Sequence, residues 1–405
     1  MSASVVIAGA GHAAGQVVAT LRQKKFDGTI TLIGEEPWLP YQRPPLSKKF
    51  LAGEFPAERL HFKPDSFYDD AGIEVQLETR IESLDCAARS LRTAAGRQLT
   101  YDKLVLATGA RPRLLQLPGV ELEGVHYLRT IADVNRIRGG LQEGARMVIV
   151  GAGYIGLEVA AVASKLGANV TVIEMEDRVM SRVVSPKISD FYQKEHAAHG
   201  VRLELSATIS GFAGNAKVTG VSLSDGSQVA ADLVVVGVGV VPNTELAIGA
   251  GLAVANGIVV DDHCRTSDPD VFAVGDCTEH PNDIYDRRVR LESVHNALEQ
   301  AKTAASNICG EDASYTQVPW FWSDQYDLKL QIAGLSQGYD QALIRGEPDA
   351  RSFSCLYLRD GQLIAVDAVN SPKDFMQSKA LIAAHAVIDP KRLSDPETEL
   401  KNMLG

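Results

Sequence analysis

Residues 148–156 read Val-Ile-Val-Gly-Ala-Gly-Tyr-Ile-Gly, an apolar run that ends in three glycines with the spacing Gly-x-Gly-x-x-Gly. The apolar run predicts a buried strand, and the residues after it, from about Ile155 to Leu166, predict a helix. Gly151 permits a tight turn, Gly153 lets the backbone approach a pyrophosphate, and Gly156 allows the helix to pack closely on the strand. Strand, glycine turn and helix in this order are typical of a fold that binds a dinucleotide.

A carboxylate at the end of the next strand indicates which dinucleotide binds here. The strand is predicted over Asn169–Ile173, and Glu174 follows it, 23 residues after Gly151 (174 − 151), close to the usual spacing of about 20. Its carboxylate can accept hydrogen bonds from a ribose 2′-OH and would repel a 2′-phosphate. No arginine follows before Arg178. The pattern favours NADH over NADPH, although an ordinary solvated acid at a strand end is the alternative.

A similar segment opens the chain. Residues 5–11 read Val-Val-Ile-Ala-Gly-Ala-Gly, so Gly9 and Gly11 repeat the first two glycines. Ala14 takes the third small position, where alanine is accepted in place of glycine. Glu35 follows the predicted second strand, where a carboxylate can bind ribose hydroxyls. Two such segments in one chain predict two dinucleotide-binding folds and two dinucleotides.

The other apolar segments fix the fold class. After about residue 320 the pattern changes to short alternating segments, which favour antiparallel strands. We therefore expect an α/β protein with two doubly wound dinucleotide-binding (Rossmann-like) domains and a smaller α+β C-terminal domain. The remaining predicted elements before residue 320 are a helix over Ala13–Lys24 and strands over Thr29–Ile33, Lys103–Gly109, Asp232–Val240 and Val271–Asp276.

Composition excludes several classes of protein. The 405-residue chain has a formal net charge of −11, which argues against nucleic-acid binding. It contains no apolar stretch long enough for a transmembrane helix, so no membrane role is expected. Five widely scattered cysteines form no CxxC pair and predict a reduced, cytoplasmic protein. The nine histidines show no metal-ligand spacing, and we expect no metal.

Several longer motifs resemble one family. The two glycine loops and Thr266-Ser-Asp-Pro-Asp-Val-Phe-Ala-Val-Gly-Asp276 are similar to the two-dinucleotide flavoprotein reductases. Pro44-Pro-Leu-Ser-Lys48, the segment Glu292–Gln300 and Trp320-Phe-Trp-Ser-Asp-Gln325 resemble, more narrowly, the NADH-dependent ferredoxin reductases of bacterial cytochrome P450 and aromatic-ring dioxygenase systems. The similarity covers essentially the whole chain. His295, where a relative has proline, is a local departure.

The resemblance implies two cofactors, FAD and NADH, and a set of residues for each. Lys48 would lie near flavin N5 and pair with Glu158, and Trp322 would cover the flavin edge; these three are the expected catalytic residues. A surface lysine and an ordinary core tryptophan are the alternatives. The residues implied for FAD are Gly9, Gly11, Ala13, Ala14, Glu35, Lys48, Ile81, Thr108, Gly109, Arg129, Asp276 and Val294. Those implied for NADH are Gly151, Gly153, Ile155, Gly156, Glu174 and Gly239.

The resemblance also implies a function and a division into domains. NADH would reduce FAD, and single electrons would leave to a [2Fe–2S] ferredoxin that serves a cytochrome P450 or a dioxygenase. The expected FAD-binding domain is residues 1–112 with 246–319, the NAD-binding domain 113–245, and the C-terminal domain 320–405. The alternatives are an NADH oxidase or disulfide-reductase-like flavoprotein and a redox-sensing flavoprotein, but residues 35–50 hold no cysteine that could act beside a flavin.

A cationic surface for the ferredoxin is a further expectation. Such ferredoxins are usually acidic and this chain is also net negative, so a local basic patch would be needed for encounter. The candidates are Arg287, Arg288, Arg290 and Lys302, which flank the Glu292–Gln300 segment. Ordinary solvated side chains are the alternative, because single surface charges usually contribute little.

Overall fold

The computed structural model describes residues 3–404, which divide into two compact units. The first unit comprises residues 3–43, 58–111 and 241–319, and the second comprises residues 44–57, 112–240 and 320–404. Each unit is therefore assembled from three separate stretches of the chain. The chain crosses from one unit to the other at β8 (Ala110–Pro112) and returns at β17 (Val240–Pro242).

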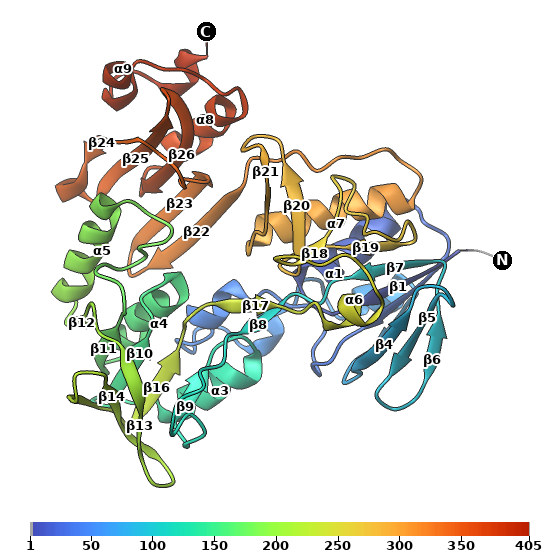
Figure 1. Ribbon diagram of the computed structural model, residues 1–405, viewed down its shortest axis with the longest axis horizontal. Coiled ribbons are helices and arrows are strands. Elements are labelled where there is room, and N and C mark those ends of the chain that lie inside the picture. Colours follow the sequence, from blue (N-terminus) through green and yellow to red (C-terminus); the bar gives the residue numbers. More distant parts are fainter. Residues whose placement is uncertain (1–2, 405) are drawn as a thin grey trace. The chain divides into compact units, whose positions relative to one another are not determined.

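A five-stranded parallel sheet forms the centre of the first unit (Figure 1). Its strands, in spatial order, are β19 (Val271–Ala273), β7 (Lys103–Leu106), β1 (Ser4–Ala8), β2 (Thr29–Ile33) and β3 (Ile73–Gln76). Since β1 lies between β2 and β7, the strand order reverses at β1. Ligands of such sheets bind outside the carboxyl end of the strand where the order reverses, which here is the end that meets Gly9.

Two helices cover this sheet on one side and share a core. Ala14 and Val17 of α1 (His12–Gln23) belong to the same buried cluster as Ala297 and Ala301 of α7 (Val294–Ile308). Small residues on both helices allow them to approach closely. The other elements of this unit are η2 (Ala57–Leu60), α2 (Ser66–Asp70), α6 (Glu245–Gly249), the sheet β4 (Ile81–Asp85), β5 (Ser90–Thr93) and β6 (Gln98–Thr100), and the sheet β18 (Ile258–Val259), β20 (Thr278–Asn282) and β21 (Arg287–Val289).

The second unit repeats the parallel arrangement. Its strands, in spatial order, are β12 (Arg202–Glu204), β11 (Asn169–Ile173), β10 (Arg146–Val150), β16 (Leu233–Val236) and β9 (Val125–Tyr127). The order reverses at β10, which ends immediately before Gly151. The associated elements are η1 (Pro44–Ser47), α3 (Ile131–Gly140), α4 (Tyr154–Lys165), α5 (Pro186–Ala198) and the sheet β13 (Ile209–Gly214), β14 (Val218–Leu223) and β15 (Gln228–Ala230).

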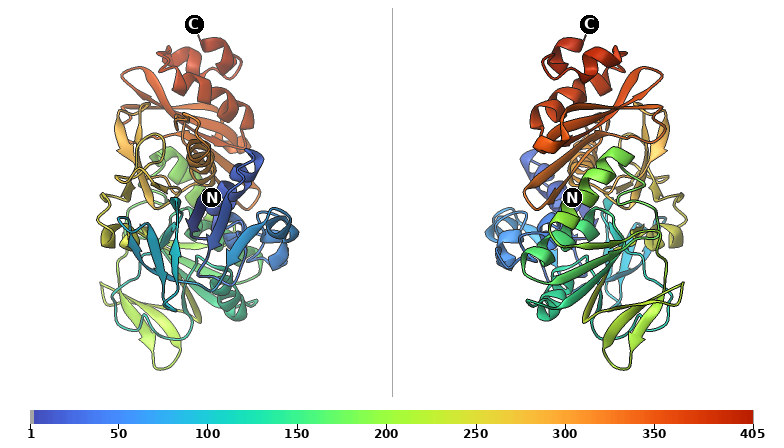
Figure 2. Two further views of the ribbon diagram at one scale, coloured as in Figure 1. Left: turned by 90° about the vertical axis from the view of Figure 1, so that its right-hand side faces the viewer. Right: turned by 90° about the vertical axis from the view of Figure 1, so that its left-hand side faces the viewer.

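An antiparallel sheet completes the second unit. Helix α8 (Pro372–Ala383) packs on β26 (Gln362–Val369) and β23 (Leu328–Gly334), so one face of this sheet is covered by C-terminal helices (Figures 1 and 2). The sheet also meets α5, because the rings of Phe191 and Phe353 lie 5.0 Å apart. Its strands, in spatial order, are β22 (Trp320–Gln325), β23 (Leu328–Gly334), β26 (Gln362–Val369), β25 (Ser352–Arg359) and β24 (Gln341–Glu347), and η3 (Pro348–Ala350), α9 (Pro390–Ser394) and η4 (Leu400–Met403) complete the region.

The expected fold class is confirmed: two parallel doubly wound sheets and a smaller α+β region are present. The predicted strands Thr29–Ile33 and Asn169–Ile173 have the observed bounds. The predicted strand Asp232–Val240 was too long, because the glycines at 237 and 239 end it at Val236. Likewise, β19 ends at Ala273, before the turn that reaches Asp276. No helix within residues 3–404 is both long and apolar enough to cross a bilayer.

Candidate active site

The first glycine loop joins β1 to α1. Gly9 has a φ of +119°, and a Cβ atom there would lie 2.2 Å from the carbonyl oxygen of Ala107, so only glycine fits. A Cβ atom on Gly11 would meet no atom of the described residues within 4 Å, so space is open in front of α1. The first N–H groups of a helix lack partners within the helix and attract anions. The loop, with Ala13 and Ala14 packed behind it, therefore fits the pyrophosphate of a dinucleotide.

Two neighbouring loops of the first unit are fixed by hydrogen bonds. The Thr108 hydroxyl donates to the backbone oxygen of Asn243 (2.7 Å), and the Asn243 amide donates back to that of Thr108 (2.8 Å), which orders the turn that contains Gly109. The buried Gln300 of α7 accepts a 2.7 Å hydrogen bond from the N–H of residue 275, immediately before Asp276. Gln300 closes the Glu292–Gln300 segment, but no sequence pattern predicted these roles for Gln300 or Asn243.

The other residues expected at FAD are distributed over both units. Glu35 follows β2, and its side chain is 67% exposed and pairs with Arg80 at 3.4 Å. Ile81 begins β4 and Val294 begins α7, and both are half-buried in the first unit. Arg129 belongs to the second unit, where it precedes the capped N-terminus of α3. Lys48 also belongs to the second unit.

The second glycine loop joins β10 to α4. Gly151 has a φ of +103°, and a Cβ atom there would lie 2.5 Å from a backbone oxygen of residue 237. At Gly156, a Cβ atom would lie 2.2 Å from the oxygen of Gly151, whereas at Gly153 it would meet no described atom within 4 Å. The open space again faces a helix N-terminus, so this loop also fits a pyrophosphate. Ile155, on the first turn of α4, is 44% exposed, and Gly239 lies in the turn after β16.

Glu174 secures this second loop. Its Oε2 accepts a 2.7 Å hydrogen bond from the N–H of Ala152, and its Oε1 accepts a 3.0 Å bond from that of Glu176. The residue is 9% exposed. A carboxylate has about four acceptor positions, so two remain for ribose hydroxyls. The structure thus gives Glu174 a role in shaping the loop that the sequence did not predict.

Lys48 and Glu158 form an ion pair in the second unit. Lys48 Nζ lies 2.6 Å from Glu158 Oε2, although 110 residues separate them. The Ser47 hydroxyl donates to the same oxygen (2.5 Å), and the Ser323 hydroxyl donates to Oε1 (2.7 Å). Glu158 is 3% exposed, so these three groups take the place of water around its carboxylate. The arrangement holds one ammonium group in a defined place, with 17% of the Lys48 side chain still exposed.

One aromatic residue of β22 contacts the helix that follows the second loop. The ring of Phe321 is 4.8 Å from that of Tyr154, the first residue of α4. Trp322 is half-buried, and its ring lies 5.6 Å from Trp320 and 6.3 Å from Phe321. Phe321 therefore places an aromatic ring beside the helix that carries Glu158, whereas Trp320 and Trp322 project from the other face of β22.

The cysteines provide no redox pair. All five are free, and three of them, Cys264, Cys277 and Cys355, are buried. Burial raises the pKa of every one of the five thiols, that of Cys355 to about 11. They are consequently protonated near neutral pH and poor nucleophiles. Within residues 3–404, no group of three or more His, Cys, Asp or Glu side chains is placed to hold a metal ion.

The proposed cationic patch is largely engaged in local interactions. Arg288 donates to the backbone oxygens of residues 260 and 279, Arg290 pairs with Glu292, and Lys302 pairs with Glu299 at 2.6 Å. Arg287 lies over the ring of Tyr285. Because carboxylates lie next to these cations, the net positive charge of this surface is smaller than the sequence suggested.

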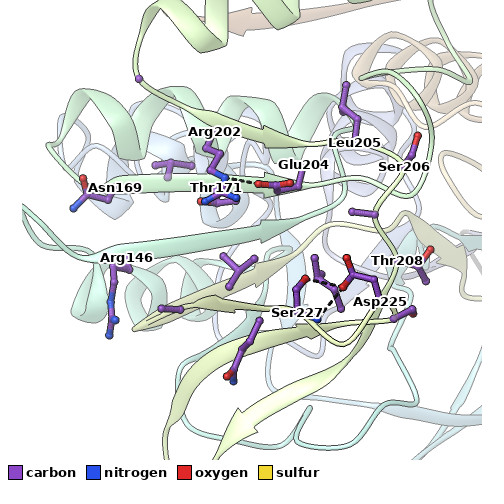
Figure 3. Close-up of a pocket in the computed structure, with 18 residues that line it drawn as sticks. Arg146, Asn169, Thr171, Arg202, Glu204, Leu205, Ser206, Thr208, Asp225 and Ser227 are labelled. Carbon is purple, nitrogen blue, oxygen red and sulfur yellow. Dashed lines mark hydrogen bonds and ion pairs between the residues drawn. The ribbon is translucent and has the colours of Figure 1, made fainter.

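A separate open groove of about 920 Å³ lies in the second unit, between the β11–β12 edge and the β13–β15 sheet. Figure 3 shows its polar side chains, including the Arg202–Glu204 ion pair and the Asp225–Ser227 hydrogen bond. None of the residues expected at the cofactors lines it. Each charged side chain of its lining already has a partner: Arg202 pairs with Glu204, Arg146 with Asp232 outside the groove, and Asp225 accepts from Ser227.

Comparison with known proteins agrees with this geometry. Residues 3–301 match the pyridine nucleotide-disulphide oxidoreductase family and residues 320–404 match the reductase C-terminal family. The chain is 47% identical, over 98% of its length and 97% of the relative's, to the 5,5′-dehydrodivanillate O-demethylase ferredoxin reductase subunit of Sphingobium sp.. It shares 41% identity and a TM-score of 0.96 with the reductase in the covalent putidaredoxin reductase–putidaredoxin complex, over 99% of this chain and 98% of that one.

A second solved structure is equally similar. The ferredoxin reductase of the CYP199A2 system from Rhodopseudomonas palustris is 43% identical, with a TM-score of 0.96 over 99% of this chain and all of that one. These likenesses extend over both glycine loops and the antiparallel sheet. The chain belongs to the pyridine nucleotide-disulphide oxidoreductase family, and within it to the ferredoxin reductases, which use FAD and a pyridine nucleotide.

Proposed function

We propose that this protein is an FAD-dependent oxidoreductase that takes a hydride from NADH and passes single electrons to a [2Fe–2S] ferredoxin, which in turn serves a cytochrome P450 or a dioxygenase. The observation that carries the proposal is the whole-chain likeness to ferredoxin reductases. It is supported by two glycine loops that each leave space at a helix N-terminus, which fits two dinucleotides.

The residues that hold each cofactor are part of the proposal, as is the division into FAD-binding, NAD-binding and C-terminal domains. Gly9 and Gly11 would bind the FAD pyrophosphate through backbone N–H groups, with Asp276 and Thr108 in the adjacent loops. Gly151 and Gly153 would do the same for NADH. The other FAD residues are Ala13, Ala14, Glu35, Lys48, Ile81, Gly109, Arg129 and Val294, and the other NADH residues are Ile155, Gly156, Glu174 and Gly239.

Lys48, Glu158 and Trp322 are the proposed catalytic residues. Bound FAD supplies the conversion of a two-electron donor into a one-electron donor. Lys48 contributes a positive charge that favours electron density on the reduced ring, and Glu158 holds the Lys48 ammonium group in place. Trp322 contributes an aromatic surface against the flavin. Hydride transfer between two cofactors requires no protein base, so no histidine is needed for it.

The observed thiols argue against the disulfide-reductase alternative, because each is protonated and none has a partner cysteine. Free, widely separated cysteines also support our proposal that the protein works in the reducing cytoplasm. The redox-sensor alternative differs from an enzyme in turnover: a sensor would not sustain rapid electron transfer to a one-electron acceptor.

An anaerobic stopped-flow experiment tests the function. NADH-reduced protein is mixed with a panel of oxidised [2Fe–2S] ferredoxins, and the absorbance of the flavin and of the cluster is followed. We expect at least one ferredoxin to be reduced rapidly, with two cluster reductions for each NADH consumed. Failure with every ferredoxin, together with rapid reduction of a disulfide or of hydrogen peroxide, would falsify the proposal.

A further inference from the structure

A line of buried hydrogen bonds leads from the surface to Glu158. The Tyr326 hydroxyl lies 3.0 Å from Nδ1 of His196, whose Nε2 lies 2.8 Å from Oε1 of Gln325. Gln325 Nε2 donates to the Ser323 hydroxyl oxygen (3.2 Å), and that hydroxyl donates to Glu158 Oε1 (2.7 Å). His196, Gln325 and Ser323 are all 0% exposed. All five side chains belong to the second unit.

The chemistry of the groups fixes the direction of this line. The Glu158 carboxylate only accepts, so Ser323 must use its one proton there, and its oxygen must accept from the Gln325 amide. The carbonyl of Gln325 then faces His196, which must donate from Nε2 and accept from Tyr326 at Nδ1. Burial lowers the pKa of His196 to about 4, so the ring is neutral and has one donor and one acceptor as this order requires. Every donor in the line points toward Glu158.

The alternating side-chain directions along β22 place Ser323 and Gln325 in this line of hydrogen bonds. Ser323 and Gln325 are two residues apart and therefore project from the same face of the strand. Asp324 projects from the other face, where it is partly exposed and 3.6 Å from Lys329. The Trp-Phe-Trp-Ser-Asp-Gln segment thus brings two buried polar groups into line with a carboxylate that lies 165 residues away from Ser323 in the sequence.

We propose that Ser323, Gln325 and His196 are positioning residues that hold Glu158, and through it Lys48, in the geometry that hydride transfer requires. This inference rests on the proposed function of Lys48 and Glu158. Buried polar groups that are replaced by apolar ones of similar shape often leave a fold equally stable, so packing alone does not require this line. Its direct effect is on Glu158, which it supplies with a third hydrogen bond besides those from Ser47 and Lys48.

Single-turnover reduction of the bound FAD by NADH tests the inference. In the holoenzyme, Ser323→Ala removes the bond to Glu158, and Gln325→Met removes the group that orients Ser323. We expect Ser323→Ala to lower the limiting rate of flavin reduction by about tenfold, which corresponds to one lost hydrogen bond to a charged group. Gln325→Met should also lower this rate, because Ser323 loses the group that orients it. NADH affinity and FAD content should change less than twofold. Asp324→Asn, on the same strand but the opposite face, is the matched control and should keep the wild-type rate.

A double-mutant cycle separates positioning from a structural effect. If Ser323 acts through Lys48, Ser323→Ala should slow reduction in the wild-type background but have little further effect in Lys48→Ala. Ser323→Thr keeps the hydroxyl and should restore at least half of the lost rate. Melting temperatures of all variants show whether any loss of rate merely follows a loss of stability.

The outcomes distinguish this inference from the proposed function. If Lys48→Ala leaves flavin reduction unchanged, the role proposed for Lys48 fails and the inference falls with it. If Lys48→Ala slows reduction but Ser323→Ala and Gln325→Met match Asp324→Asn, the inference alone is overturned. Rate losses that simply multiply in the double mutant would also overturn it, because they would show an effect that does not pass through Lys48.

Discussion

The carboxylate of Glu174 accepts a 2.7 Å hydrogen bond from the backbone N–H of Ala152, the second residue of the glycine loop. Ala152 is fully buried, so this N–H has no access to water. Glu174 therefore serves two purposes: it holds the loop in shape, and its remaining acceptor positions and negative charge face the nucleotide in the proposed complex. Substitutions at this position should affect both properties.

Replacement of Glu174 should reduce the preference for NADH over NADPH. Glu174→Ser removes the charge that repels a 2′-phosphate, so the ratio of kcat/KM for NADH to that for NADPH should fall by at least tenfold. Because the Ala152 N–H also loses its acceptor, kcat/KM for NADH itself should fall, by an amount that corresponds to about 1–3 kcal/mol. Steady-state kinetics with both nucleotides measure this. A wild-type enzyme that used both nucleotides equally well would contradict the specificity argument.

Lys48→Ala should leave Glu158 buried without its cation. Loss of one partner of a buried ion pair typically lowers the free energy of unfolding by about 3 kcal/mol or more. Because Lys48 is partly exposed, we expect a loss at the lower end of that range. We expect a lower melting temperature together with slower flavin reduction by NADH. The double variant Lys48→Ala/Glu158→Gln should recover much of the melting temperature but not the rate. Recovery of both would mean that the ammonium group has no catalytic role.

The sequence predicted local features well and distant ones poorly. Strands next to the glycine loops, such as Asn169–Ile173, could be predicted because alternation and glycine spacing are local signals. The residues that contact Glu158 could not be located from sequence patterns alone, since Lys48 follows η1, Glu158 lies on α4 and Ser323 on β22, three elements far apart in the sequence. The Lys48–Glu158 pair was expected solely from family resemblance. The further line through Gln325 had no sequence signal beyond the two-residue spacing of β22.

The buried His196 should make the protein sensitive to mild acid. Burial lowers its pKa from about 6.5 to about 4, so the unfolded chain binds a proton in this interval that the folded protein does not. Its contribution to stability is present above pH 6.5 and is lost as the pH falls toward 4, by up to about 3 kcal/mol. The difference between the melting temperatures at pH 7.5 and pH 5 should therefore be smaller in His196→Gln than in the wild type. His385→Gln, at an exposed position, should keep the wild-type difference.

Asp367 should have the opposite effect on the pH dependence of stability. Burial raises its pKa to about 7, although the hydroxyl of Tyr357 donates a hydrogen bond to it. The folded state therefore holds a proton between pH 4 and 7 that the unfolded chain releases, so ionisation destabilises the fold as the pH rises through this interval. Above pH 7, ionisation of Asp367 lowers the free energy of unfolding by an amount that approaches about 4 kcal/mol. Asp367→Asn should thus raise the melting temperature more at pH 8 than at pH 5. An equal change at both values would show that Asp367 is already ionised at pH 5.

The last prediction concerns the thiols. If electrons leave singly to a ferredoxin, no cysteine takes part, and the native enzyme should retain its activity after treatment with iodoacetamide at pH 7.5. The reason is physical as well as functional: alkylation requires an accessible thiolate, whereas burial raises the pKa of Cys355 to about 11 and also raises that of the half-buried Cys86 and Cys309. Mass spectrometry reports which thiols react, and ferredoxin reduction is assayed on the same sample. Modification of Cys86 or Cys309 without loss of turnover would agree with the proposal. Rapid inactivation that tracks modification of one cysteine, and that occurs only after reduction by NADH, would instead indicate a thiol that exchanges electrons with the flavin, and the disulfide-reductase alternative would then replace the ferredoxin reductase.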